Sequence, residues 1–326
     1  MRLKRYNATD KSAWDNFVAN SRNGTFLFHR DYMDYHEDRF DDYSLMIYDE
    51  KDNLLALFPA NKRDMRLDSH GGLTYGGFIV DDNMKVPKML DVFHAMLSYA
   101  SEQGFKTIRY KTIPHIYHDA PTEEDLYALY LCDAQVINRP VITAIRMDNP
   151  LKFQTRRRRG VKVARKAGIT ARQSDDWRAY WDILEALLAN VHDAEPVHSY
   201  DEITMLSERF PKNIKLYGAF TDDDQLIAGI VIYETERVAR CQYIAASIRG
   251  QNLGALDYLF DYLLKEVYID KPYFEFGTSQ ADENPDYLNS GLIDQKEGFG
   301  ARAIMQDTYL ITLDTVTIQR LTEALI

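Results

Sequence analysis

The sequence predicts an α/β fold in which two similar domains with mixed sheets follow one another. The chain of 326 residues is long enough for two domains of ordinary size. Segments with helical periodicity alternate with short apolar segments typical of strands. In addition, LMIYDEKDNLLALF (45–58) resembles LYGAFTDDDQLIAGIVI (216–232), and repetition at this distance indicates a duplicated domain. Two unrelated α/β domains are the alternative.

The first half alternates helices with strands. Pro87 stands at the start of its most regular helical pattern, and Gly104 follows the end, as is common at helix termini. We expect helices at residues 10–20, 30–40 and 86–103 and strands at 44–48, 54–59, 71–80 and 105–113.

The second half repeats this order. Its first two predicted strands are joined by three consecutive aspartates, Asp222 to Asp224, which favour a turn. We expect helices at residues 177–191 and 254–267 and strands at 213–220, 226–234, 237–247 and 273–277.

The sharpest change of composition follows Pro150. Residues 152–172 carry nine Lys and Arg and no acid, whereas the whole chain has a net charge of −11. We therefore place the first domain at residues 1–150 and the second at 151–315. The remaining residues, 316–326, have the pattern of a short amphipathic helix, which either caps a domain or meets a partner.

Composition and charge exclude several classes of protein. The net charge of −11 argues against a protein that binds DNA or a membrane surface through general positive charge. The longest apolar segments are far shorter than the roughly 20 residues that span a bilayer, so we expect no membrane span. Cys132 and Cys241 are too few for a cysteine-rich zinc site, and they fit buried thiols in the cytoplasm. No pattern of ligand residues predicts a metal site.

A glycine-rich segment after the predicted strand 237–247 is the first candidate for chemistry. Because it opens a helix, its backbone N–H groups and the positive end of the helix dipole would suit a phosphate group. An ordinary turn between a strand and a helix has a similar composition and is the alternative. The candidate cofactor-binding residues are Arg249, Gly250, Gln251, Asn252, Gly254 and Ala255.

This segment, RGQNLG, resembles the pyrophosphate loop that binds acyl-CoA in the GNAT acyltransferases. Asn252 stands where that loop usually has a glycine. The resemblance implies acetyl-CoA or another acyl-CoA as co-substrate. The segment NSGLIDQKEGFGAR (289–302) resembles the closing motif of the same family, which often supplies a tyrosine as general acid. Asp294 or Gln295 stands at that place here, which leaves the acid unassigned.

The motifs RRRRGVKVARKAGI, PVHSYDEI, YFEFGTS and DQKEGFGAR together resemble the FemAB-like proteins, in which two GNAT-like domains follow one another. The resemblance covers most of the chain. Members of that family transfer amino acids from aminoacyl-tRNA to peptidoglycan precursors. The resemblance implies that the second domain holds the donor. The first domain has VDDNMKVPKML (80–90) at the place of the loop, with two acids and without the glycines.

The basic segment is a candidate patch for the phosphate groups of CoA, of a nucleotide-linked acceptor or of tRNA. A solvated helix face is the alternative for such a run of charges. Four consecutive arginines point to different sides of a helix, so at least one of them faces water. The candidate substrate-binding residues are Arg156, Arg157, Arg158 and Arg165.

Four residues of the second domain are candidates for catalysis. His198 has a side chain that titrates near neutrality, and Tyr243 lies on the strand before the loop. Glu275 alternates with aromatic residues in YFEFG, where an unpaired carboxylate is hard to bury. Lys296 matches a lysine of the FemAB-like closing motif, and the resemblance implies a place beside the reacting carbonyl. Each residue has a structural alternative, as part of the core or as a surface lysine.

These observations predict an N-acyltransferase of the GNAT and FemAB-like type that uses acyl-CoA and an amine acceptor, either a small molecule or a nucleotide-linked compound. One alternative is a transferase that takes its aminoacyl group from tRNA and acts on a cell-wall precursor. Another is a ligand-binding protein whose transferase domains have lost activity. A general RNA binder, the remaining alternative, conflicts with the net charge of −11.

Overall fold

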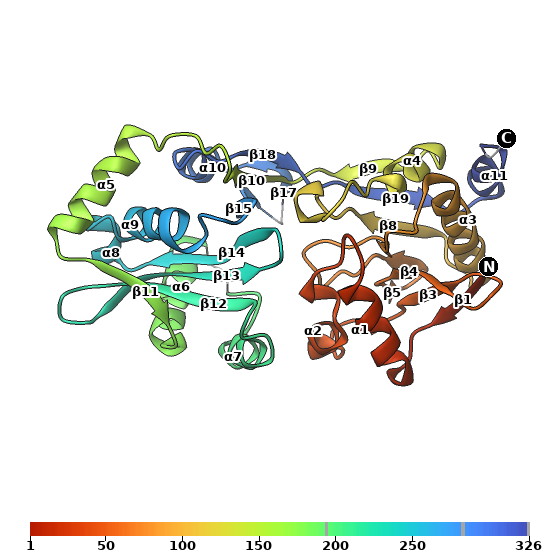
Figure 1. The fold of residues 1–326 in the computed structure, drawn as a ribbon, viewed down its shortest axis with the longest axis horizontal. Coiled ribbons are helices and arrows are strands. Elements are labelled where there is room, and N and C mark those ends of the chain that lie inside the picture. Colours follow the sequence, from red (N-terminus) through yellow and green to blue (C-terminus); the bar gives the residue numbers. More distant parts are fainter. Residues whose placement is uncertain (193–194, 282–283, 325–326) are drawn as a thin grey trace. The chain divides into compact units, whose positions relative to one another are not determined.

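The chain forms two compact units (Figure 1). Unit 1 comprises Met1–Pro140 and Met305–Ile326, and unit 2 comprises Val141–Ile304. These boundaries differ from the predicted ones at residues 150 and 315. The computed structural model describes residues 1–192, 195–281 and 284–324.

Strand pairing explains the difference in the boundaries. Strand β10 (Val141–Arg146) pairs with β15 (Tyr273–Thr278) and so belongs to unit 2. Strand β19 (Thr308–Thr312) pairs with β8 (Thr107–Lys111) and so belongs to unit 1. The change of composition marks the basic segment, but it carries no information about which strands pair.

Unit 1 contains two sheets. Their orders are β1-β3-β4-β7 and β2-β5-β6-β8-β19-β9, and only β6 and β8 run parallel among the pairings that the structure describes. Besides β8 and β19, the strands are β1 (Arg2–Arg5), β2 (Asp41–Asp42), β3 (Leu45–Tyr48), β4 (Leu54–Phe58), β5 (Asn61–Arg63), β6 (Arg66–Asp68), β7 (Ile79–Val80) and β9 (Gln135–Asn138).

The helices of unit 1 are mostly short. They are α1 (Lys11–Ala19), α2 (Arg30–Met33), α3 (Val86–Glu102), α4 (Glu124–Leu131) and α11 (Thr315–Glu323), with 3-10 turns η1 (Ala8–Asp10), η2 (Phe26–Phe28), η3 (Asp34–His36) and η4 (His115–Tyr117). The last described helix, α11, packs on α3 and places Leu321 in the core of unit 1. Most of the segment expected as a strand at 71–80 is instead irregular, and only β7 is extended.

Unit 2 is built on one sheet of seven strands in the order β11-β12-β13-β14-β15-β10-β18. Besides β10 and β15, its strands are β11 (Thr170–Ser174), β12 (Ile214–Phe220), β13 (Leu226–Glu234), β14 (Val238–Ala246) and β18 (Arg302–Met305), and β16 (Gln280–Ala281) and β17 (Asn284–Leu288) form a separate pair. Its helices are α5 (Thr155–Lys166), α6 (Trp177–His192), α7 (Tyr200–Arg209), α8 (Ile248–Asn252), α9 (Ala255–Tyr262), the π-helical turn η5 (Leu263–Val267) and α10 (Ser290–Glu297).

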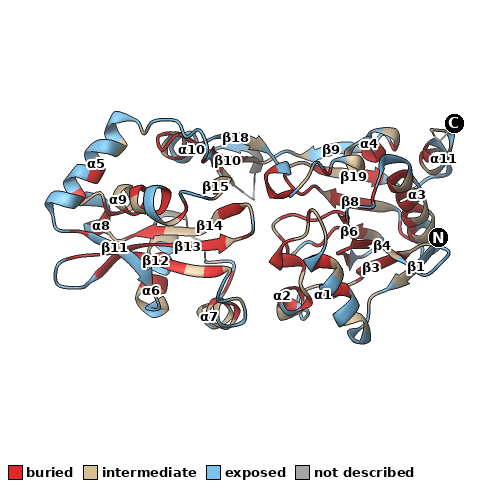
Figure 2. Ribbon diagram, viewed as in Figure 1, coloured by how far each residue is buried: buried red, intermediate tan, exposed pale blue. Residues whose placement is uncertain are grey.

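Helices cover both faces of this sheet. Figure 1 shows α9 and α5 on one side of it and α6 and α7 on the other. The central strands β12 and β13 are therefore buried almost throughout, as Figure 2 shows, and they read as continuous apolar runs. Among the described residues, no helix is both long and apolar enough to cross a bilayer.

A half-buried acid in unit 1 gives a first testable prediction. The Tyr110 hydroxyl donates to Asp125 Oδ2 at 2.7 Å, and burial raises the pKa of Asp125 to about 6. An acid whose pKa is raised by folding destabilises the folded state above that pKa and not at low pH. At pH 7.5 we expect Asp125→Asn to raise the free energy of unfolding by about 2 kcal/mol over that of the wild type. At pH 4 this difference should disappear. Urea unfolding at both pH values measures it. An advantage independent of pH would contradict the assignment.

Candidate active site

Two neighbouring strands of unit 2 separate from one another in the middle of the sheet. Strands β14 and β15 run parallel and pair only over Val238–Arg240 and Tyr273–Glu275. Beyond this point β14 continues to Ala246 along β13, while β15 follows β10. Backbone groups at the facing edges of both strands are thereby released from sheet pairing.

Each strand carries a β-bulge where the separation begins. On β14, Val231 and Ile232 of β13 lie opposite Tyr243 and Cys241, so Gln242 is an extra residue. On β15, Phe276 and Gly277 together face one residue of β10, because the register shifts between its neighbours. Gly277 has a φ of 73°, which favours glycine. Since a bulge bends its strand, the paired bulges account for the separation.

Helix α10 brings Lys296 to this opening. The side chain of Asn289 caps the helix by accepting the N–H of Leu292 at 3.0 Å. Near the other end, Lys296 is only 4% exposed, and its Nζ donates to the Gly277 carbonyl at 3.1 Å and to the Thr278 carbonyl. Burial lowers the pKa of Lys296 to about 8, so the side chain is a buried ammonium at neutral pH.

Glu275, predicted to need a partner, is paired with Arg240 on the adjacent strand. Glu275 is 1% exposed, and its Oε1 accepts from Arg240 Nε at 3.2 Å. Arg240 also donates to the side-chain oxygen of Gln242 in the bulge. The carboxylate of Glu275 in turn favours the charged form of Lys296 and acts to raise its pKa. The three charged groups therefore influence one another, with Glu275 and Lys296 buried and Arg240 half-buried.

His198 and Tyr243, two further candidates, contact each other directly. His198 Nδ1 and the Tyr243 hydroxyl oxygen are 2.6 Å apart, and the backbone N–H of His198 donates to the same oxygen at 3.2 Å. Burial raises the pKa of Tyr243 to about 12, whereas Arg240 acts to lower it. A capping box of Ser199 and Glu202 at the start of α7 holds the backbone beside His198.

The structure thus brings His198 into contact with Tyr243. It places Glu275 and Lys296 where β14 and β15 separate, each held by partners that were not among the predicted residues. Sequence reasoning missed Arg240, the charged partner in an otherwise apolar strand, and the bulge at Gln242. It also missed Ser279, whose buried hydroxyl has no hydrogen-bond partner among the described atoms. A single charge within each of two apolar strands, Arg240 and Glu275, was the available signal.

The six predicted cofactor-binding residues do not form an open cradle of N–H groups. Part of the segment is the short helix α8, and the Gly250 N–H is already bonded to the Ser247 side chain at 3.1 Å. Arg249 donates to Gln225 at 2.8 Å, and the Gln251 amide donates to the Ala246 carbonyl at 3.2 Å. Asn252 is exposed and Ala255 is buried in the core.

Both glycines of this segment serve close packing of the protein on itself. A Cβ on Gly250 would collide with the Ile227 carbonyl of β13. A Cβ on Gly254, which has a φ of 68°, would lie 2.7 Å from the Gly160 carbonyl of α5. Helix α5 therefore covers the start of α9, where the pyrophosphate of an acyl-CoA would have to bind. The residues present do not fit that group.

Most of the predicted substrate-binding arginines form ion pairs that hold α5 against other helices of unit 2. Arg157 pairs with Asp257 of α9 at 2.9 Å, and Arg165 pairs with Asp261 at 2.9 Å. Arg156 is half exposed and pairs with Asp294 of α10. Arg158 donates to Thr155 of its own helix at 3.1 Å and borders a cavity.

Several solved structures resemble this chain. No family model and no curated protein matches the chain. Among solved structures, FemX is 11% identical over 100% of both chains, with a TM-score of 0.67. L-PGS from Bacillus licheniformis is 14% identical over 98% of this chain and 97% of its own, with a TM-score of 0.58. A tandem GNAT protein from the clavulanic acid biosynthesis pathway is 12% identical over 96% and 98%, with a TM-score of 0.52.

The chain has the tandem GNAT fold. The predicted fold class, and the resemblance to FemAB-like proteins as far as it concerns the fold, are confirmed. In the tandem GNAT fold of this chain, the separated strands belong to unit 2, and the predicted catalytic residues lie beside them. Cys132 and Cys241 are buried thiols as predicted, and no group of three or more His, Cys, Asp or Glu within the described ranges could hold a metal ion.

The packing of Gly254 can be tested against a matched glycine. Gly104 has a φ of 87°, but nothing lies within 4 Å of an added Cβ there. We expect Gly254→Ala to lower the free energy of unfolding by about 1–3 kcal/mol more than Gly104→Ala, because only Gly254 combines a positive φ with a collision against α5. Urea unfolding followed by circular dichroism measures both. Equal losses would show that α5 does not constrain this position.

Proposed function

We propose that unit 2 catalyses transfer of an acyl or aminoacyl group from an activated ester to an amine. The buried ammonium of Lys296, held by backbone carbonyls where β14 and β15 separate, is the observation that carries this proposal. A fixed cation in a site shielded from water stabilises the negative charge that develops on a carbonyl oxygen under attack.

In the proposed reaction the lone pair of the acceptor amine attacks the carbonyl carbon of the donor. The carbonyl oxygen takes the negative charge beside Lys296, and collapse of the intermediate breaks the ester bond and releases an alcohol. The amine loses one proton during the reaction. His198, which contacts the Tyr243 hydroxyl through Nδ1, would accept that proton at Nε2 and pass it to the leaving oxygen. Glu275 and Arg240 act as positioning residues.

The filled segment at Arg249–Ala255 favours an ester donor over acyl-CoA. Its glycines pack against β13 and α5, so no cradle supports a pyrophosphate. The resemblance to FemAB-like proteins supports aminoacyl-tRNA as this donor and a small-molecule or nucleotide-linked amine as acceptor. Exposed cations of the basic segment, such as Arg159 and Lys162, would then meet RNA phosphates. We propose a cytoplasmic location because tRNA is found there.

The choice of donor leads to a direct experiment. We expect CoA and acetyl-CoA to leave the unfolding temperature unchanged, because the segment at Arg249–Ala255 is filled by its own packing. A ligand that binds the folded state only would raise that temperature with saturation. An acylated tRNA pool should bind, with an affinity that falls steeply as salt rises. A saturable rise of the unfolding temperature with acetyl-CoA that disappears in Arg249→Ala would instead favour acyl-CoA over aminoacyl-tRNA as the donor.

Lys296 provides a test of the catalytic centre. We expect Lys296→Met to lower the transfer of labelled amino acids from tRNA to Nα-acetyl-lysine amide by about 100- to 1,000-fold, as for loss of one oxyanion donor. Lys212→Met removes an exposed lysine and serves as the control. Full activity of Lys296→Met would exclude the proposed role. Binding of tRNA by the wild type without transfer to any amine would instead favour a protein that has lost activity.

The same variant has a characteristic stability profile. Because burial lowers the pKa of Lys296 to about 8, its charge destabilises the folded state at pH 7, and this destabilisation is lost as the pH rises toward 10. The free energy of unfolding of Lys296→Met, measured relative to that of the wild type, should therefore be about 2 kcal/mol lower at pH 10 than at pH 7. Urea unfolding at both pH values measures the change. A difference independent of pH would mean that Lys296 is not a buried cation.

A further inference from the structure

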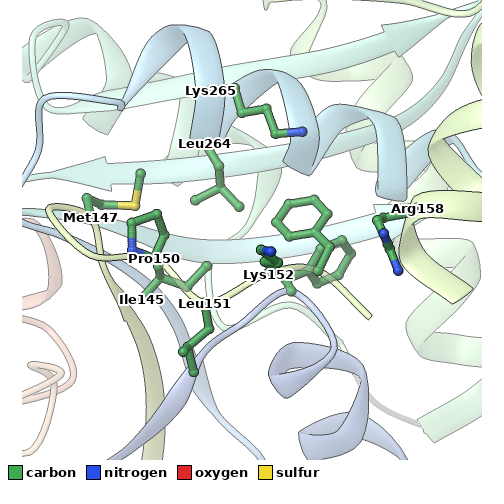
Figure 3. Close-up of a pocket in the computed structure, with 10 residues that line it drawn as sticks. Ile145, Met147, Pro150, Leu151, Lys152, Arg158, Leu264 and Lys265 are labelled. Carbon is green, nitrogen blue, oxygen red and sulfur yellow. The ribbon is translucent and has the colours of Figure 1, made fainter. Parts of the chain in front are cut away.

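A cavity of about 320 Å³ opens between α5, η5 and the segment that leads from β10 into α5. Figure 3 shows Leu264 and Lys265 reaching into it from one side and Met147, Pro150 and Leu151 from the other. All of its lining residues belong to unit 2, and it uses none of the four residues of the proposed catalytic centre. Its volume lies at the lower end of the range for small-ligand sites.

The walls of this cavity are apolar. Ile145, Met147, Leu264 and Phe299 are buried residues whose side chains form the inner surface. Phe153 adds an aromatic face, with its ring edge-on to Phe299 at a centroid distance of 5.3 Å. An apolar surface of this kind takes hydrocarbon from water at a gain of about 0.8 kcal/mol per methylene.

Backbone packing holds the cavity open. A Cβ on Gly300, which has a φ of 97°, would lie 2.6 Å from the Leu151 carbonyl, so the segment before α5 rests directly on this glycine. The Gln154 N–H donates to the Gly298 carbonyl at 2.8 Å. On the opposite side, the π-helical turn η5 presents Leu264 and Lys265 to the cavity. Such turns interrupt regular helices and occur frequently at functional sites.

The opening of the cavity is positively charged. Lys152, Arg158 and Lys265 line it, and no acid does so within the part of the chain that the structure describes. Lys265 pairs with Asp261 of α9, but Arg165 pairs with the same carboxylate, so this group of three keeps one net positive charge. The ammonium of Lys265 also lies 5.2 Å from the centroid of the Phe153 ring.

We propose that this cavity binds a single acyl chain that ends in a carboxylate or phosphate group. The chain would lie against Ile145, Leu264 and Phe299, and its anionic end would meet Lys152 and Arg158 at the opening. The hydrocarbon accounts for the apolar walls and the anion for the cations, whereas a purely polar phosphate compound would leave the walls unused. This inference concerns a site separate from the proposed catalytic centre and does not depend on the transfer reaction.

Isothermal titration with soluble amphiphiles tests the proposal on the full chain. We expect one equivalent of dodecanoate or dodecyl phosphate to bind, and dodecyltrimethylammonium not to bind. Across saturated carboxylates from butyrate upward, affinity should rise about fourfold per methylene until the cavity is full. Similar affinity for the cationic and anionic amphiphiles, or several weak equivalents, would overturn the proposal, because either result means adsorption to general apolar surface.

Two variants locate the site. Leu264→Trp fills the cavity, and the double variant Lys152→Glu with Arg158→Glu reverses the charge at its opening. We expect each to weaken dodecanoate binding at least tenfold. The control Lys51→Glu with Lys85→Glu makes the same change of net charge at exposed positions of unit 1 and should bind normally. Unchanged binding by both cavity variants, with unfolding temperatures near that of the wild type, would overturn the assignment.

A final arm distinguishes the source of the acyl chain. Vesicles of phosphatidylcholine with phosphatidylglycerol present the same chemistry in a membrane, and co-sedimentation measures binding to them. Sedimentation that is lost in the charge-reversal variant supports the cavity with a lipid as the source. Binding of dodecyl phosphate without sedimentation supports the cavity with a free amphiphile as the source. Absence of both kinds of binding refutes the proposal.

Discussion

The separation of β14 from β15 is the constraint on which the proposed centre depends. Two bulges, one at Gln242 and one at Phe276 and Gly277, bend the strands apart. The carbonyl of Gly277, no longer used within the sheet at this edge, accepts a hydrogen bond from Lys296. An ammonium group could not remain charged in this buried place without such acceptors and the nearby carboxylate of Glu275. The bend in the two strands therefore exposes an acceptor that helps to keep Lys296 charged.

Helix α5 shows how the same residue types can serve binding or packing. Its arginines and the glycines of the following helical segments resemble a phosphate site, yet Gly160 and Gly254 allow two helices to approach closely. Arg157 then neutralises Asp257 in the first turn of α9, a position where an acid also suits the helix dipole. A bound pyrophosphate would have to displace this contact. In this chain, charge and close packing stabilise the helix pair.

Much of the fold could be predicted from the sequence, because it rests on local patterns. The long helix α3 has its apolar residues at helical spacing, and β12 and β13 are apolar runs separated by an aspartate-rich turn. The resemblance of several motifs to FemAB-like proteins indicated the tandem GNAT fold. The unit boundaries were not predictable in this way, because β10 and β19 take their places through pairing with strands that lie far away in the chain.

The sequence by itself determined which residue types were available: Glu275 and Tyr243 stand in apolar strand segments, His198 titrates near neutrality, and Lys296 matches a lysine of the FemAB-like closing motif. Only the tertiary structure decided their partners, since the contacts of His198 with Tyr243 and of Glu275 with Arg240 join positions 45 and 35 residues apart. It also decided that the glycine-rich segment packs against α5. The reason is physical: hydrophobic periodicity records which side of an element is buried, whereas the identity of the neighbour depends on how the whole sheet is assembled.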